Sequence, residues 1–311
     1  MPDTPTTDRL YRQMLGPFPE RVPLNLACVE RVDAGDHTRE LIAYDNDAEE
    51  RVHAYVLRPK GFNGPRPAVL VFHGHGPWHL GKASTAIEGA DDRPGKVAMG
   101  PLLARRGFIV LCGDAICWGH RQNPEPKPEG MLYERLVAMR LLAQGRCMAN
   151  QYVFDAMRQC DVLETLPDVD PERIGATGVS MGSGHTWLSA MVERRLKALV
   201  AVSSFYTYKA LYQPPIQHCY MNYLPNVLAL GVETYDLFGL IAPRPFLMIN
   251  GSTNEQDPVE ATRELYEKAR PHWRRHQAEE HFQLHVHEQG HGHTPATREL
   301  AIDFLATHLS V

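Results

Sequence analysis

Short apolar runs recur along the chain and are separated by longer mixed segments. The early runs, LNLACVERV, RELIAYD and RVHAYVLRP, read as β-strands, and Pro59 with the GFNGPRP turn ends the last of them. The later runs are short and continuously apolar: PAVLVFH, FIVLCGD, RIGATGV, LKALVAV, PFLMING and HFQLHVHE. Continuously apolar strands that alternate with helices predict a mainly parallel central sheet with helices on both faces, which is an α/β fold.

The segments between these strands predict helices at about 96–106, 151–166, 181–194, 258–270 and 295–309. Two longer excursions, 119–144 and 204–237, are respectively rich in proline and in tyrosine. Long connections between sheet elements often serve as lids or pocket walls, so we expect that role for both. Residues 1–22 are expected to form an N-terminal extension. With no internal repeat or linker, residues 1–311 are predicted to form one domain.

The composition is that of an ordinary globular protein, with 43% hydrophobic and 22% charged residues. A net charge of -5 provides no basic field, so we expect no nucleic-acid partner and no membrane partner. No apolar run is long enough to span a membrane, and the first residues lack a signal pattern, which predicts a cytoplasmic protein. The six cysteines lack paired spacing and are expected to be buried free thiols. The composition is compatible with a homo-oligomer as well as a monomer.

The segment GVSMG, with Ser180 at its centre, fits the G-x-S-x-G pattern of a nucleophile elbow. The strand-like RIGATGV precedes it and the helix-like SGHTWLSAMVERR follows it, which is the context that the motif requires. Glycines let strand and helix approach closely around a serine whose strained backbone exposes its hydroxyl. Ser180 is therefore predicted to be a nucleophile rather than an ordinary turn serine.

The segment HGHG follows the predicted strand PAVLVFH, where its glycines allow a backbone N–H to point into the site. We expect the backbone N–H groups of His75 and Met181 to form an oxyanion hole. His73 is interpreted as a packed structural histidine.

A general base is expected after the last predicted strand, in HEQGHGH. His291 is favoured over His293 because it follows EQG directly, whereas His293 falls nearer the last helix. The wider run His281, His285, His287, His291 and His293 also suggests a metal site. No carboxylate or cysteine completes a recognisable ligand set, so we expect no metal and no cofactor.

These motifs together resemble the dienelactone hydrolase and acetyl xylan esterase-like family of the α/β-hydrolases. The resemblance extends from about residue 15 onward and includes HGHG, GDAICWGHR, VFDAMRQCDVLETLPDVDPERIGATGVSMG, LIAPRPFLMING and QGHGH. It implies a cofactor-free serine esterase in which Ser180 is the nucleophile, His291 the base, and His75 with Met181 the oxyanion donors. Dienelactone hydrolase itself has a cysteine at the elbow, so Ser180 points to ester hydrolysis.

The acid of the expected triad is ambiguous. The resemblance implies a G-x-x-D-x-x-x-P pattern, which Gly251 and Pro258 fit, but Asn254 stands at the aspartate position. Glu255, Asp257 and Asn254 itself therefore remain alternatives. Asp257 also fits a helix N-cap, followed by proline and a capping-box glutamate, which would be purely structural.

The sequence thus predicts a serine carboxylic-ester hydrolase that acts on small or short-acyl esters through an acyl-enzyme. The alternatives are a deacetylase of sugar or xylan acetyl esters and a serine peptidase. Outside the enzymes, a non-catalytic binding protein with this fold is favoured only by Asn254. Aromatic residues of the excursions are candidates for pocket walls: Trp78, Trp118, Tyr133, Tyr206 and Tyr212.

Overall fold

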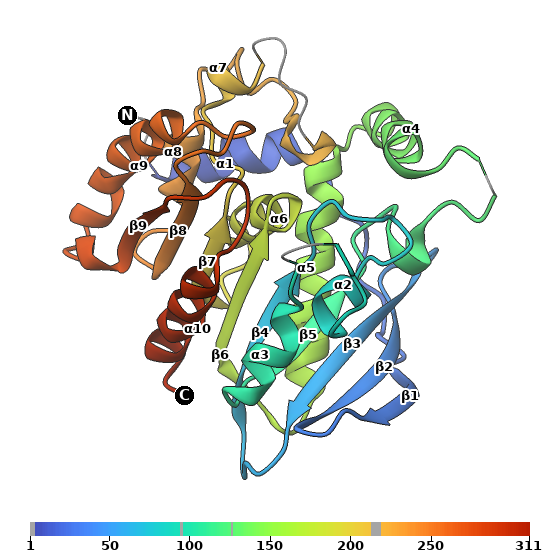
Figure 1. Ribbon diagram of the computed structural model, residues 1–311. Coiled ribbons are helices and arrows are strands. Elements are labelled where there is room, and N and C mark those ends of the chain that lie inside the picture. Colours follow the sequence, from blue (N-terminus) through green and yellow to red (C-terminus); the bar gives the residue numbers. More distant parts are fainter. Residues whose placement is uncertain (1–3, 94–95, 126, 213–218) are drawn as a thin grey trace.

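Nine strands form one sheet in the computed structural model, which describes residues 4–93, 96–125, 127–212 and 219–311 (Figure 1). Their order across the sheet is β1-β2-β3-β5-β4-β6-β7-β8-β9. The pairs β1–β2, β2–β3 and β3–β5 are antiparallel, and all later pairs are parallel. The strands are β1 Ala27–Asp33, β2 His37–Asp45, β3 Arg51–Pro59, β4 Arg66–Phe72, β5 Ile109–Gly113, β6 Val169–Val179, β7 Leu196–Val202, β8 Phe246–Gly251 and β9 Phe282–His287.

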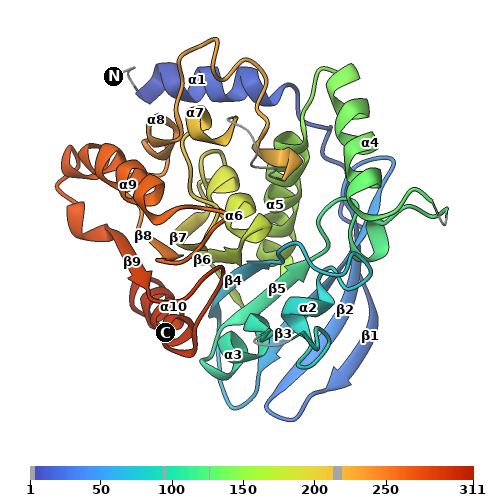
Figure 2. The same ribbon diagram turned by 45° about the horizontal axis from the view of Figure 1, so that its top comes forward.

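Helices cover both faces of this sheet (Figures 1 and 2). The α-helices are α1 Thr4–Leu15, α2 Ala83–Ala86, α3 Met99–Arg105, α4 Gly130–Ala143, α5 Met148–Thr165, α6 Met181–Ala190, α7 Tyr208–Leu211, α8 Thr234–Phe238, α9 Val259–Arg274 and α10 Pro295–Leu309. Short 3₁₀ helices occupy Gly119–Arg121, Tyr220–Asn222 and Glu279–His281. Among these described helices, none is both long and apolar enough to cross a membrane.

Strands β4, β5 and β8 are almost entirely apolar because each buries both of its faces. On β4, Ala68, Leu70 and Phe72 join the core that also holds α1, α5, α6, α8 and α9. The intervening Val69 and Val71 join a second core beneath α2, α3 and α10. Successive side chains of a strand point to opposite faces, so a strand between two helical layers needs apolar residues at every position. The predicted α/β fold, with a mainly parallel sheet, is confirmed.

Five of the described α-helices, α1, α2, α4, α7 and α8, lie where the sequence predicted none, and α4 and α1 are the longest of them. Residues 130–143 of the first excursion form α4, on which Leu132, Leu136 and Met139 are exposed. These apolar side chains face away from the core, so the segment lacks the polar outer face that marks an amphipathic helix. The N-terminal extension contains α1, which is anchored because Tyr11 Oη donates a hydrogen bond to the Leu188 carbonyl at 2.9 Å. In addition, α3 begins at Met99 rather than at residue 96.

The cysteines follow the predicted pattern with one exception. All six are free, and Cys112, Cys117, Cys147, Cys160 and Cys219 are buried. Cys28 is exposed on the edge strand β1, so the expectation of burial is wrong for that residue.

Candidate active site

Ser180 occupies a sharp turn between β6 and α6. Its backbone has φ 60° and ψ −118°, and its N–H donates to the Val202 carbonyl at 2.8 Å. Non-glycine residues rarely adopt positive φ, and such strain persists only where the surrounding structure enforces it. The turn therefore holds the serine at the carboxyl edge of the sheet and at the N-terminus of α6.

The two glycines of GVSMG make this turn sterically feasible. A Cβ on Gly178 would lie 2.3 Å from the Gly182 carbonyl oxygen, and a Cβ on Gly182 would lie 2.1 Å from the Phe72 carbonyl oxygen. Both distances are far below van der Waals contact. Glycine is required at position 178 because β6 and α6 touch each other within the elbow, and at position 182 because α6 packs directly against β4.

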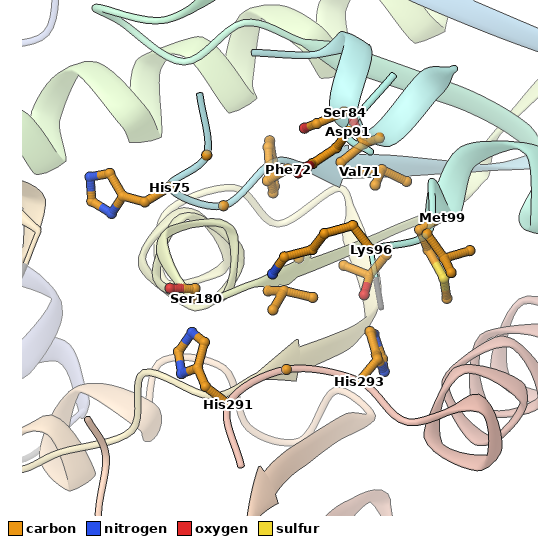
Figure 3. A pocket seen from close by; sticks show the side chains of 18 of the residues that line it. Val71, Phe72, His75, Ser84, Asp91, Lys96, Met99, Ser180, His291 and His293 are labelled. Carbon is orange, nitrogen blue, oxygen red and sulfur yellow. The ribbon is translucent and has the colours of Figure 1, made fainter. Parts of the chain in front are cut away.

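A pocket of about 320 Å³ opens beside Ser180. Its lining includes His75 from the loop after β4, Lys96 before α3, and His291 with His293 from the turn after β9. Figure 3 shows the ring of His291 next to the Ser180 hydroxyl, and the chain of Lys96 extended across the pocket toward them. Side chains from distant parts of the sequence thus meet at the end of the parallel strands, where α/β folds bind ligands.

Asp257 lies behind His291, on the side that faces away from the pocket. Its Oδ2 is 3.7 Å from His291 Nδ1, and its side chain is only 2% exposed. In the described structure, His291 Nδ1 is buried and makes no hydrogen bond. The distance exceeds a hydrogen bond, but catalytic contacts are often long in the absence of ligand. The geometry thus offers the Asp257 carboxylate as a partner for this ring nitrogen.

The Asp257 carboxylate is held in place by two donors. The Ser204 N–H donates to its Oδ2 at 2.7 Å, and Asn254 Nδ2 donates to the same oxygen at 3.2 Å. Helix α9 begins at Val259 with Pro258 as its N-cap residue, and no side-chain capping bond is present. The interpretation of Asp257 as a helix cap is therefore wrong, because its carboxylate points back toward β7 and His291.

Asn254 and Glu255 occupy different environments. Asn254 is buried, accepts hydrogen bonds from the N–H groups of Gln256 and Asp257, and donates to Asn250 Oδ1 at 2.8 Å. It thus closes the loop that presents Asp257. Glu255 is exposed and makes neither a hydrogen bond nor an ion pair with His291. Of the three alternatives for the acid, only Asp257 lies within ion-pair distance of His291.

His287 and His293 flank the turn that carries His291. His287 is buried, its Nδ1 accepts from the Gln289 N–H, and its Nε2 lies 3.0 Å from the Gly292 carbonyl. These bonds fix the tautomer with the proton on Nε2. His293 Nδ1 lies 3.2 Å from Thr297 Oγ1, within the capping box of α10. The sequence did not predict that His287 shapes this turn. It suggested His287 only as one residue of a possible metal site.

Burial shifts the pKa values of the facing acid and base in opposite directions. It lowers the pKa of His291 to about 4, with a further contribution from the positive charge of Lys96. It raises the pKa of Asp257 to about 6, against the lowering effects of the Ser204 N–H and Asn254. At pH 7 the imidazole is therefore neutral and the carboxyl is ionised, which is the state required to accept a proton and then to stabilise the resulting cation.

The loop of HGHG passes directly over the elbow. A Cβ on Gly74 would lie 2.8 Å from the Val179 carbonyl oxygen and 3.6 Å from Ser180 Cβ. The neighbouring His73 is buried, its Nε2 accepts from the Ala115 N–H at 3.0 Å, and it thus packs as a structural residue. The Met181 N–H is the first of α6, and the first N–H groups of a helix have no partner within that helix.

Two buried residues that the sequence did not single out hold the side chain of His75. Its Nε2 lies 3.3 Å from Glu134 Oε2, and its Nδ1 lies 3.1 Å from Cys219 Sγ. Burial lowers the pKa of His75, but Cys219 and Glu134 outweigh it and raise that pKa to about 10. Glu134 comes from α4, the helix that the sequence did not predict.

The remaining candidates lie elsewhere. The pocket beside Ser180 is not lined by any of the five aromatic candidates; Tyr212 instead lines a separate apolar pocket with Tyr223 and Leu228. Trp118 is buried and packs edge-on against the rings of His73 and His75. Within the described ranges, no group of three or more histidine, cysteine or acidic residues is arranged to hold a metal ion.

Comparison with known proteins agrees with this architecture. Residues 125–220 match the family model of acetyl xylan esterase. The chain is 28% identical over 299 residues to YtaP of Bacillus subtilis (strain 168), which is a hydrolase by name, and the match covers 96% of each protein. Acetyl xylan esterase 1 from Thermoanaerobacterium sp. JW/SL YS485 superimposes with a TM-score of 0.65 at 16% identity, covering 99% of this chain and 94% of that one.

A glucuronoyl esterase from Solibacter usitatus superimposes with a TM-score of 0.70 at 16% identity, covering 98% of this chain and 91% of that one. Similarity at this level of identity extends to the fold. The nucleophile elbow, the topology of the sheet and these matches agree with one another. The chain therefore has the α/β-hydrolase fold, and residues 125–220 are similar to the acetyl xylan esterase family.

Proposed function

We propose that the protein is a serine carboxylic-ester hydrolase that acts on small or short-acyl esters. The observation that carries this proposal is the position of Ser180, on a strained elbow beside His291, with Asp257 3.7 Å behind the imidazole. In this scheme Ser180 is the nucleophile, His291 the general base and Asp257 the acid that orients the base.

The reaction proceeds in two halves. His291 takes the proton of the Ser180 hydroxyl as its oxygen attacks the ester carbonyl, and then donates that proton to the leaving alcohol. Water, activated by the same imidazole, hydrolyses the acyl-enzyme and regenerates the serine. Asp257 stabilises the imidazolium in both halves; a movement of about 0.7 Å would bring it from 3.7 Å to hydrogen-bond distance.

The oxyanion of each tetrahedral intermediate is assigned to the backbone N–H groups of His75 and Met181. The Met181 N–H begins α6, where the helix dipole adds partial positive charge. The glycines around His75 allow its backbone to approach the elbow. Donors that are fixed before the reaction stabilise the developing charge without reorganisation, which is the largest single contribution in many acyl-transfer enzymes.

Turnover of 4-nitrophenyl acetate tests this function. The wild-type protein should release nitrophenol and should form a covalent adduct of one phosphonate per chain on Ser180, detected by mass spectrometry. Ser180→Ala should keep the fold, as judged by circular dichroism, and lose both properties. Unchanged turnover in folded Ser180→Ala would rule out the serine mechanism.

Deacetylation of sugar or xylan esters is a second candidate, favoured by the match of residues 125–220 to the acetyl xylan esterase model. Acetate release from acetylated xylan and from a fully acetylated monosaccharide, compared with release from 4-nitrophenyl acetate, tests it. The cytoplasmic location remains a prediction; six free cysteines are in keeping with a reducing compartment.

A further inference from the structure

The pocket beside Ser180 contains more positive than negative charge, although the whole protein has a net charge of -5. Its lining includes three permanent cations, Arg93, Lys96 and Arg298, and one carboxylate, Asp91. Arg93 forms an ion pair with Asp91 at 2.6 Å. The other two cations of the lining are Lys96 and Arg298.

Neither of these two cations has a carboxylate within ion-pair distance among the residues that the structure describes. Lys96 extends across the pocket toward Ser180 and His291 (Figure 3), and Arg298 projects from the first turns of α10, beside His293. His75 differs from them, because Glu134 lies 3.3 Å from its ring and balances its charge. Asp91 also interacts electrostatically with Lys96, so the three cations of the lining exceed its one carboxylate by two positive charges.

This charge affects two of the three histidines that line the pocket, His291 and His293. After burial, the largest cause of the lowered pKa of His291 is Lys96. After burial, the largest cause of the lowered pKa of His293 is Arg298. Two separate cations therefore lie close enough to these imidazoles to lower their pKa values, although the side chain of Lys96 is exposed.

We infer that the ester substrate carries a second, negatively charged group, a carboxylate, and that Lys96 and Arg298 bind it. This inference rests on the proposed ester hydrolysis at Ser180. An arginine and a lysine that line the same small pocket can bind one carboxylate with charge-assisted hydrogen bonds. A pocket of about 320 Å³ has room for an ester of only a few carbons plus that group.

The same arrangement links substrate charge to catalysis. Lys96 opposes the positive charge that His291 must acquire when it takes the serine proton. A carboxylate bound at Lys96 would neutralise that opposing charge at the moment of reaction. A charged substrate should therefore have both a higher kcat and a lower KM than its neutral counterpart. If Lys96 had a purely structural role, it would not change either constant for the charged substrate more than for the neutral one.

Two matched substrate pairs test the inference and distinguish the two halves of the ester. Mono-4-nitrophenyl succinate and 4-nitrophenyl methyl succinate differ only in a charged or methylated carboxyl on the acyl side. O-acetylglycolate and O-acetylglycolamide differ on the alcohol side, where the first has a carboxylate and the second a neutral amide. Their hydrolysis is followed by pH-stat. The enzyme-free rate is subtracted in each case, because a free carboxylate accelerates its own ester's hydrolysis.

For at least one pair, kcat/KM of the charged member should exceed that of the neutral member by about tenfold at low salt, and the ratio should fall as salt is added. Lys96→Met and Arg298→Gln should each lower this ratio several-fold, and the double variant should bring it to about one. Lys96→Met should also move the acid limb for the neutral ester to higher pH. Lys197→Met removes a positive charge at the start of β7, whereas Ser180 lies where the parallel strands end. This control variant should leave the ratio unchanged.

The inference is overturned if neither pair shows a preference for the charged member, or if a preference persists in the double variant. If the variants do not fold, the salt dependence of the kcat/KM ratio of the wild-type enzyme tests the inference. A ratio that does not fall as salt is added would then overturn it. Failure of the proposed function is a different result, because the neutral members would then not be hydrolysed either.

Discussion

The side-chain nitrogen of Asn254 lies 3.2 Å from Asp257 Oδ2 and donates a hydrogen bond to it. Asn254, at the position where the sequence pattern led us to expect an aspartate, thus supports a carboxylate three positions further along the chain. The same amide group also donates to Asn250 Oδ1 at the end of β8. The acid of the proposed triad, Asp257, is therefore connected through Asn254 to the end of β8.

Asp257→Asn should lower kcat by about three to four orders of magnitude, because an amide favours the wrong imidazole tautomer and does not stabilise the imidazolium. The fold should persist, since the amide oxygen can still accept the Ser204 N–H. Glu255→Gln removes an equal charge from an exposed position in the same loop and should retain nearly full activity. Steady-state kinetics and melting temperatures of both variants measure this difference, and the reverse ranking would identify Glu255 as the acid.

Asn254→Asp should reduce activity, although it introduces the aspartate that the sequence pattern led us to expect at this position. It replaces a donor with a second carboxylate about 3.2 Å from Asp257 and removes the bond to Asn250. Two carboxylates at that distance cannot both be ionised near neutral pH, so one is protonated or the loop rearranges. Thermal unfolding and kcat should both fall. A faster Asn254→Asp enzyme would mean that position 254 can serve as the acid.

The acid limb of kcat/KM should lie between about pH 6 and pH 4. Activity requires neutral His291, whose pKa is lowered to about 4, so it is retained above that pH and lost below it. It also requires ionised Asp257, whose pKa is raised to about 6, so loss begins as the pH falls through that value. The residual activity of Asp257→Asn should lack the upper step. A single step near pH 8 in the wild type would contradict this assignment.

His291→Ala and His293→Ala should have opposite effects on activity and stability. His291→Ala removes the proposed base and should reduce kcat by orders of magnitude while leaving the melting temperature nearly unchanged. His293→Ala removes a bond to Thr297 at the start of α10 and should cost about 1 kcal/mol of stability, with substantial activity retained. If His293→Ala were inactive and His291→Ala active, His293 rather than His291 would be the base.

Ser180→Gly should be more stable than Ser180→Ala. Both variants lack the nucleophile, but Ser180 has φ 60°, which glycine adopts without a steric penalty. Strain of this kind typically costs about 1–3 kcal/mol. Parallel thermal unfolding of the two variants measures the difference. Equal melting temperatures would mean that the elbow stores little strain.

The pattern of apolar runs was sufficient to predict all nine strands and the α/β class. The signal was clearest for inner strands such as β4, β5 and β8, which are buried on both faces and need an apolar residue at almost every position. Local motifs likewise led to Ser180 and His291 as candidates, and the structure places both in the lining of one pocket. The elbow is recognisable in the sequence because the glycines it requires are close neighbours of the serine. Helix α4 escaped prediction because its exposed leucines blur the amphipathic pattern.

Only the tertiary structure distinguished among Asn254, Glu255 and Asp257, which are neighbours in one loop. Which carboxylate faces His291 depends on the path of that loop between β8 and α9, set by hydrogen bonds from Ser204 and Asn254. The pairing of Glu134 with His75, 59 residues away in the chain, likewise has no local signal. Contacts between distant segments arise from packing, and packing is determined by the whole fold rather than by neighbouring residues.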